Sequence, residues 1–174
     1  MNLLDMEISS TRTIAKTDKY CEQTITYFCK ESPLGKYFSA FYGDELCYLK
    51  FYDTDYQNCL GHLQKLYPDA NLCSNNNFEI PPKLKILLKG SDFDVKVWKE
   101  LLNIKKGKTL SYSDVAISIG NPKSVRAVGN AVGRNNIVYI VPCHRVIQKA
   151  GTLGGFGCGP HKKLKMLSYE GVNL

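Results

Sequence analysis

Two Ser-x-x-Asp motifs, at 91–94 and at 111–114, stand directly before apolar helical repeats in the second half of the sequence. A serine followed three residues later by an acid forms a capping box, which fixes where a helix begins. A glycine follows each repeat, and glycine commonly ends a helix because it accepts a left-handed backbone. The sequence therefore predicts short helices over 92–103 and 112–119.

A third short helix is predicted over 123–132, ended by Gly133. Asn121 is expected to cap it, with Pro122 at its first position. Three valines are expected on its buried face and four polar residues on its exposed face: Val125, Val128 and Val132, and Lys123, Ser124, Arg126 and Asn130. The spacing fits a helix-turn-helix, although any pair of helices joined by a glycine-containing turn shows the same pattern.

The first half of the sequence has the alternation and the turns of a small antiparallel sheet. Ser32-Pro33-Leu34-Gly35 is a turn sequence, and Gly43-Asp44 lies between two alternating segments, which is a hairpin signal. The predicted segments are strands over 20–28, 36–42 and 46–52, a helix over 54–67 and a polar loop over 71–77.

Pro81-Pro82 is predicted to be a stiff connection between two domains, with the boundary at 80–91. We therefore expect the mixed α/β (α+β) class, with an α/β domain over 1–85 and a helical domain over 91–174.

The positive charge of the sequence belongs to its second half. Residues 1–91 contain 10 Lys and Arg against 11 Asp and Glu, a net charge of −1, whereas residues 92–174 contain 13 against 5, a net charge of +8. Such a block favours a polyanionic partner, most simply nucleic acid, although a merely solvated basic surface would show the same excess.

The sequence has none of the segments that direct a chain to a membrane or out of the cell. Its apolar runs are too short to span a bilayer, and residues 1–19 lack the apolar core of a signal peptide. The seven cysteines are an odd number and include no C-x-x-C pair, which argues against a disulfide framework and a ribbon-type zinc site. We expect an intracellular protein, cytoplasmic in a prokaryote and nuclear in a eukaryote.

Cys143 differs from the other cysteines because it lies in the string Pro142-Cys143-His144-Arg145-Val146 after the apolar run 137–141. An imidazole and a guanidinium beside a thiol favour the thiolate over the thiol, whose usual pKa is about 8.5. For an isolated Cys-His pair, the simpler interpretation is a buried cysteine beside a surface histidine.

The string and its neighbours resemble the O6-alkylguanine-DNA alkyltransferases, also called methylated-DNA–protein-cysteine methyltransferases. The resemblance covers 91–171, and in the first half it covers Ser32 to Gly35 and the hairpin that follows. The matching blocks around the string are Ser111-Tyr112, Gly120-Asn121-Pro122-Lys123, Arg126-Ala127-Val128-Gly129-Asn130-Ala131 and Gly151-Thr152-Leu153.

The resemblance implies a ribonuclease-H-like N-terminal α/β domain and a helical C-terminal domain with a helix-turn-helix. It implies direct repair of double-stranded DNA: the alkyl group moves irreversibly from O6 of guanine, and also from O4 of thymine, to the protein's own cysteine, without a cofactor. A monomer that binds the minor groove and flips the damaged base is expected.

By the same resemblance, Cys143 is the nucleophile, His144 accepts its proton through a water, and Glu170 orients the imidazole. Asn135 is the hinge that precedes the active-site segment. Without the resemblance, Glu170 would be read as an ordinary surface acid and Asn135 as a loop residue. The residues implied to hold the flipped nucleotide are Tyr112, the Val146 carbonyl, Phe156 and the Gly157 amide.

The resemblance also assigns residues to DNA. Arg126 is implied to occupy the position that the flipped base vacates, and the small residues Ala127, Gly129 and Ala131 to allow close approach to the minor groove. Tyr112 is implied to contact the DNA at the flipped nucleotide, and contacts to phosphate or sugar are implied for Ser113, Asn121 and Lys149. Each of these residues could instead be an ordinary packing or solvated residue.

The sequence departs from the family pattern in two places. Phe156-Gly157-Cys158 replaces a tyrosine-containing pocket loop, and Val138 stands where some members have proline, so we expect a wider or differently shaped pocket. Some members bind a structural zinc in the N-terminal domain. Cys21 and Cys47 lie near two of those positions, but Tyr42 and Lys83 occupy the others, so we expect no metal.

Two alternatives belong to other functional classes. A non-enzymatic damage sensor would bind alkylated DNA without a reactive cysteine, and Cys143 argues against it. A hydrolase or thiol transferase using Cys143 and His144 would turn over repeatedly and would not need a basic domain. The number of alkyl groups transferred per molecule separates the three.

Overall fold

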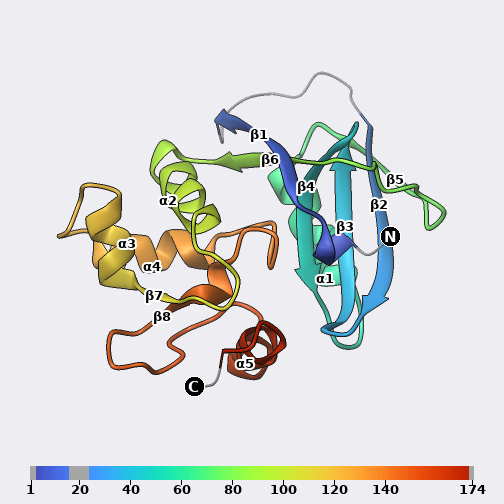
Figure 1. The fold of residues 1–174 in the computed structure, drawn as a ribbon. Coiled ribbons are helices and arrows are strands. Elements are labelled where there is room, and N and C mark those ends of the chain that lie inside the picture. Colours follow the sequence, from blue (N-terminus) through green and yellow to red (C-terminus); the bar gives the residue numbers. More distant parts are fainter. Residues whose placement is uncertain (1–2, 16–23, 173–174) are drawn as a thin grey trace. The chain divides into compact units, whose positions relative to one another are not determined.

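The computed structural model describes residues 3–15 and 24–172. The chain divides into two compact units, Met1–Gly90 and Ser91–Leu174, each with its own core (Figure 1). No helix in the described ranges is long and apolar enough to cross a membrane.

Within residues 3–15 and 24–90, the first unit forms a six-stranded mixed sheet with strand order β1-β6-β4-β3-β2-β5. The central strands β2, β3 and β4 are antiparallel, while β1 and β4 pair in parallel with β6, and β5 pairs in parallel with β2. The elements are the short helix η1 (Leu3–Asp5), β1 (Ile8–Ala15), β2 (Thr24–Ser32), β3 (Gly35–Tyr42), β4 (Glu45–Phe51), α1 (Gln57–Leu66), β5 (Asn71–Ser74) and β6 (Leu84–Gly90).

The two hairpins of this sheet follow the turns that the sequence predicts. Ser32 pairs with Gly35, and Gly43 adopts a φ of +60°, which a residue without Cβ accepts at little cost. Side chains alternate across the sheet, so that Phe38 faces the core formed with Leu63 of α1, whereas the Phe41 ring packs against that of Phe78 at a tilt, away from this core.

The first unit differs from the sequence prediction in three elements. Strands β1 and β6 were not predicted, and β6 continues the sheet to Gly90, beyond the predicted domain end at residue 85. The polar loop predicted over 71–77 is wrong for Asn71–Ser74, which form β5. This edge strand pairs with β2 through its backbone and leaves its side chains largely exposed, so its sequence carries no apolar alternation. The predicted strand residues 20–23 lie outside the described residues.

The helix of the first unit begins later than the sequence suggests. It was predicted over 54–67 but starts at Gln57, because the Asp55 carboxylate accepts the Gln57 backbone N–H at 3.0 Å in a local turn.

The second unit consists of short helices and a two-stranded parallel ladder. Its elements are α2 (Asp92–Leu102), β7 (Leu110–Ser111), α3 (Tyr112–Ser118), α4 (Val125–Gly133), the short helix η2 (Cys143–Arg145), β8 (Val146–Ile147) and α5 (Pro160–Tyr169). Both predicted capping boxes are confirmed, at the starts of α2 and α3. Trp98 of α2 is buried and donates its indole N–H to the Ala131 carbonyl of α4 at 2.8 Å, which ties these helices together.

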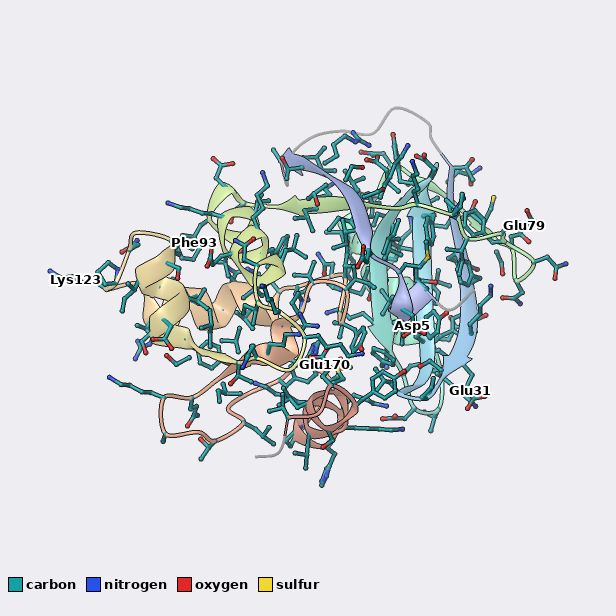
Figure 2. All side chains as sticks on the ribbon, viewed as in Figure 1. Asp5, Glu31, Glu79, Phe93, Lys123 and Glu170 are labelled. Atoms are coloured by element: carbon teal, nitrogen blue, oxygen red, sulfur yellow. The ribbon has the colours of Figure 1, made fainter. Side chains whose placement is uncertain are left out.

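The start of α4 corrects the sequence prediction. Ser124, not Asn121, precedes the helix, and its side chain makes no capping bond. The Asn121 carbonyl instead accepts both the backbone N–H and the hydroxyl of Ser124, at 3.0 and 2.7 Å, in a separate turn. Val128 and Val132 are buried as predicted, but Val125 at the first helical position is 38% exposed. Figure 2 shows Lys123 on this turn, with its side chain projecting away from the helices.

Candidate active site

Cys143 begins the short helix η2, at the end of a buried segment that starts at Ile137. The segment folds into tight turns: the Val141 N–H donates to the Ile137 carbonyl at 2.9 Å, and the Cys143 N–H donates to the Val141 carbonyl at 2.8 Å. Because Cys143 is only 2% exposed, its thiol is fixed by the surrounding backbone.

The Asn135 side chain organises this segment from inside. Its Nδ2 donates to the Val141 carbonyl at 2.9 Å and to Sγ of Cys143 at 3.1 Å, and its Oδ1 accepts the Ile137 N–H at 2.9 Å. Asn135 is buried directly after α4. One amide therefore joins the end of that helix, the turn and the thiol.

Behind the thiol lies a buried chain of charged and polar groups. Nε2 of His144 lies 3.1 Å from Oε1 of Glu170. Glu170, labelled in Figure 2, directly follows α5. Arg145 donates to both carboxylate oxygens, at 2.8 and 2.7 Å, and also to the Ile104 carbonyl. No spacing in the sequence connects residues 144 and 170, yet the side chains of His144 and Glu170 are both fully buried.

Burial alone would raise the pKa of Glu170, but hydrogen bonds from His144 and Arg145 outweigh it and lower that pKa to about 2. Burial in turn lowers the pKa of His144, although Glu170 opposes this. A carboxylate only accepts hydrogen bonds, so the neutral imidazole carries its proton on Nε2. Nδ1 then has a lone pair; it is buried and has no hydrogen-bond partner among the described residues.

The loop before α3 fixes the backbone at Glu170. Gly107 has a φ of +77°, and a Cβ there would lie 3.3 Å from the Glu170 carbonyl oxygen. A larger residue at 107 would combine backbone strain with this close approach.

Tyr139 covers the face of the His144 ring. The two rings are parallel within 2°, with centroids 5.1 Å apart. Tyr139 is buried and has a φ of +78°, a conformation that costs residues other than glycine about 1–3 kcal/mol.

Lys163 of α5 is a buried cation at the site. Its Nζ donates to the Val146 carbonyl at 2.6 Å and to the Leu153 carbonyl, and it lies 5.9 and 5.7 Å from the ring centres of Tyr112 and Phe156. Burial lowers the pKa of Lys163 to about 8, opposed by the negative charge of Cys143. The amine is therefore electrostatically coupled to the thiol.

Tyr112 and the loop 154–157 lie together beside Lys163. The Tyr112 hydroxyl donates to the Gly155 carbonyl at 3.2 Å, and a Cβ at Gly154 would lie 3.4 Å from the Tyr112 ring. Phe156 is partly buried and Gly157 is exposed. The Val146 carbonyl already accepts from Lys163, and a carbonyl has a second lone pair available.

The residues assigned to DNA lie on α3, α4 and the adjoining turns. Arg126 and Ala127 are exposed in the first turn of α4, and Gly129 lies further along, with its Cβ position 3.9 Å from the Tyr112 ring. Asn121 and Lys149 are exposed, and the Ser113 hydroxyl is 2.8 Å from that of Ser111. Ala131 is fully buried, so its place is in the core of the unit and not on an open helix face.

No cluster of three or more His, Cys, Asp or Glu side chains suited to a metal occurs in ranges 3–15 and 24–172. Cys21, which was considered for such a site, lies outside the described residues.

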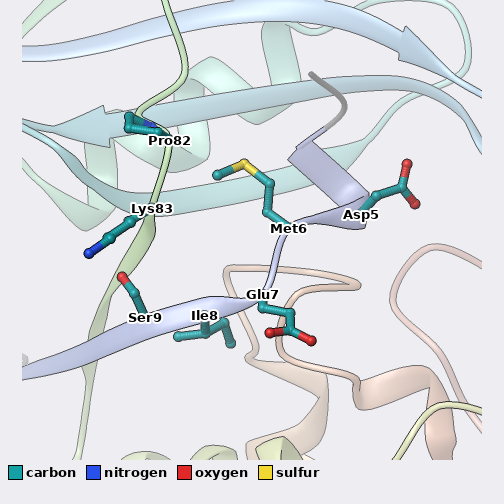
Figure 3. A pocket seen from close by; sticks show the side chains of 7 residues that line it. All are labelled: Asp5, Met6, Glu7, Ile8, Ser9, Pro82 and Lys83. Atoms are coloured by element: carbon teal, nitrogen blue, oxygen red, sulfur yellow. The ribbon is translucent and has the colours of Figure 1, made fainter.

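The first unit has an open pocket of about 470 Å³, lined by residues 5–9 with Pro82 and Lys83 (Figure 3). Its charged side chains Asp5, Glu7 and Lys83 are exposed to solvent. None of the predicted site residues lines it.

Sequence reasoning missed two residues of the site, Tyr139 and Lys163. Tyr139 was read as part of an apolar run, and Lys163 was not singled out. Lys163 lies three residues before the buried Met166 and four before the buried Leu167. This helical spacing places Lys163 on the buried face of α5, and it could have identified the residue from the sequence.

Comparison with known proteins gives consistent matches. Residues 92–172 match the family model described as 6-O-methylguanine DNA methyltransferase, DNA binding domain. The chain is 46% identical over 117 residues to a probable methylated-DNA–protein-cysteine methyltransferase of Acanthamoeba polyphaga mimivirus, covering 67% of this chain and 73% of that protein. It is 36% identical over 155 residues to the methylated-DNA–protein-cysteine methyltransferase of Mycobacterium bovis, covering 84% and 92%.

Among solved structures, the chain is similar to the crystal structure of Mycobacterium tuberculosis OGT in complex with DNA. The TM-score is 0.66 at 32% sequence identity, and the match covers 83% of this chain and 92% of that one.

Proposed function

The chain belongs to the methylated-DNA–protein-cysteine methyltransferase family, and we propose that it repairs DNA by transferring an alkyl group from O6 of guanine to Cys143. The observation that carries this proposal is the buried thiol of Cys143, which accepts a hydrogen bond from Asn135 beside the His144–Glu170 pair. Such an arrangement serves a nucleophile activated by a base that a third group orients.

The reaction begins when the Cys143 thiol gives its proton, through a water, to Nδ1 of His144. Glu170 stabilises the resulting imidazolium, and Lys163 stabilises the thiolate. Sγ then attacks the alkyl carbon: the S–C bond forms, the C–O6 bond breaks, and the electron pair stays on guanine, which takes up one proton. The net change moves the alkyl group to sulfur and the thiol proton to guanine. No cofactor is needed, and each molecule acts once.

The substrate base must leave the duplex before it can reach a buried thiol, so the reaction requires base flipping. In this proposal α3 and α4 form a helix-turn-helix that approaches the minor groove, with Ala127 and Gly129 allowing close contact. Arg126 fills the vacated stack, Ser113, Asn121 and Lys149 contact the backbone, and Tyr112, Val146, Phe156 and Gly157 hold the flipped nucleotide. The basic charge of this unit makes the affinity salt-dependent.

The N-terminal α/β unit, Met1–Gly90, is ribonuclease-H-like and carries no metal, and the helical unit, Ser91–Leu174, carries the chemistry. The protein acts as a monomer inside the cell, in the cytoplasm of a prokaryote or the nucleus of a eukaryote. It also accepts O4-alkylthymine.

The loop 156–158 gives the pocket a shape that differs from that of other members. This shape determines which sizes of alkyl adduct the protein accepts. The rate of inactivation by free O6-benzylguanine tests it. A rate equal to that of a susceptible family member would mean that Phe156, Gly157 and Cys158 leave the pocket unchanged.

The function is tested by incubating the full chain with a duplex that contains O6-methylguanine, followed by digestion and mass spectrometry. We expect one methyl group per molecule, on the peptide that contains Cys143, and none with an undamaged duplex. Cys143→Ser abolishes transfer, whereas Cys73→Ser, at an exposed cysteine of the first unit, retains it. Binding without transfer would identify a damage sensor, and continued turnover a hydrolase; either outcome overturns the proposal.

A further inference from the structure

The rings of Tyr139 and His144 make a parallel contact inside the second unit. Aromatic rings in cores adopt many tilts, whereas these two lie within 2° of parallel at 5.1 Å, an offset stack. The Tyr139 ring therefore covers one face of the imidazole while Glu170 binds its Nε2 edge.

The backbone conformation of Tyr139 is a second indication that this residue has a specific role. Its φ of +78° is the only positive value of a non-glycine residue in the described ranges. Glycine would adopt this turn with less strain, and it has no ring. The position thus keeps an aromatic residue where the backbone favours glycine.

We propose that Tyr139 is a positioning residue for His144: its ring face holds the imidazole in the plane that serves Cys143 and stabilises the imidazolium that forms when the thiol gives up its proton. This inference rests on the proposed function. Tyr139 touches neither the alkyl group nor the guanine in this role, and it acts only through His144.

The charge around His144 explains why such help is needed. Glu170 favours the imidazolium, whereas Arg145 on η2 and Lys163 on α5 both oppose it, and burial opposes it further. The thiolate forms on Cys143, the residue directly before His144 in the sequence. An aromatic face attracts a cation through its quadrupole and adds no charge that would disturb the bond between Arg145 and Glu170.

The experiment compares three variants of the full chain. Tyr139→Phe keeps the ring, Tyr139→Leu replaces it with an aliphatic side chain, and Tyr139→Gly fits the backbone but lacks a ring. For each, the rate of methyl transfer from an O6-methylguanine duplex and the rate of Cys143 modification by iodoacetamide are measured against pH.

We expect Tyr139→Phe to match the wild type within about twofold. Tyr139→Leu and Tyr139→Gly slow both reactions about three- to tenfold at pH 7. Their half-maximal rates move to higher pH by about half a unit to one unit, because the thiolate–imidazolium pair is less stable. Wild-type rates and an unchanged pH profile in Tyr139→Gly would overturn the inference, since the residue would then serve only the turn.

A measurement on the unmodified protein keeps the inference testable if the variants unfold. The imidazole protons of His144 should show an upfield ring-current shift in NMR spectra that the exposed His161 lacks, and Tyr139→Phe should preserve it. Absence of this shift would refute the stacking. If the wild type transfers no alkyl group, the proposed function fails instead, and the ring-current shift still reports on the stack.

Discussion

The side chain of Asn135 donates to Sγ of Cys143 at 3.1 Å while accepting the backbone N–H of Ile137 at 2.9 Å. The donor to sulfur is an amide N–H, which favours the thiolate because it adds a hydrogen bond without adding a negative charge. The same amide closes the turn between α4 and η2. The geometry of the nucleophile and the fold of its segment therefore depend on one residue.

Replacing Asn135 by Asp tests this relationship, because the side chains have the same shape but the carboxylate cannot donate. We expect transfer to slow about ten- to hundredfold, since a hydrogen bond to an ionised group is lost and a negative charge faces the thiolate. The free energy of unfolding in urea, followed by Trp98 fluorescence, should fall by about 2 kcal/mol. Asn136→Asp, at the next and only partly buried residue, is the control. Equal effects of both variants would contradict the role given to Asn135.

The low pKa of Glu170 predicts how stability changes with acid. Its folded pKa of about 2 lies below its value in an unfolded chain, about 4.3, so its contribution is present above the unfolded value and is lost as the pH falls toward 2. The loss should be on the order of 3 kcal/mol between pH 5 and 2. Glu170→Gln should lose about this much less stability than the wild type when unfolding is measured across this range, because Asp94, whose pKa is also lowered, still contributes its own acid-dependent loss.

Glu100→Gln is the control for this measurement. It makes the same substitution at a glutamate of α2 that is not paired with His144. It should retain the acid-dependent loss of the wild type. If Glu170→Gln loses stability with acid as the wild type does, another group carries the dependence.

Local signals in the sequence located the helices of the second unit well. A capping box spans four residues, so Ser91 and Asp94 determine the start of α2 wherever the helix packs. The failed cap at Asn121 has a local reason too, because its carbonyl is used in a turn with Ser124. Asp94 also forms a 2.5 Å ion pair with Arg134, and no local pattern predicts a partner 40 residues away.

Long-range pairing was the part that the sequence did not reveal. β1 and β5 are strands because β6 and β2 offer backbone partners, and their exposed residues lack the alternation of a half-buried strand. Lys163 belongs to the site because the Val146 and Leu153 carbonyls converge on it. Glu170 could be assigned only through a family resemblance, since its contact with His144 spans 26 residues.

Lys163→Met should weaken the thiolate of Cys143. The ammonium lies buried near the thiol, and its removal leaves the negative charge less stabilised. We expect iodoacetamide to react about tenfold more slowly at pH 7, with the half-maximal rate about one unit higher. The difference from the wild type should shrink above pH 8, because Lys163 itself loses its proton near that value. Lys162→Met is the control, and an identical profile in both variants would remove Lys163 from the mechanism.

Arg126→Ala separates base flipping from alkyl transfer. Arg126 is exposed on α4, whereas Cys143 and His144 are buried, so the loss of Arg126 should leave the chemistry of the thiol intact. We expect repair of an O6-methylguanine duplex to slow about hundredfold, because extruding a base costs a few kcal/mol that Arg126 no longer offsets.

The matched measurement for Arg126→Ala uses free O6-benzylguanine, which needs no flipping and should react at the wild-type rate within about twofold. Lys123→Ala, on the turn before α4, should weaken duplex binding only modestly and reduce its salt dependence by about one counterion. An equal loss by Arg126→Ala on the duplex and on the free base would place Arg126 in folding or transfer. No loss on the duplex would exclude it from flipping, because the extruded base would then be stabilised by other groups.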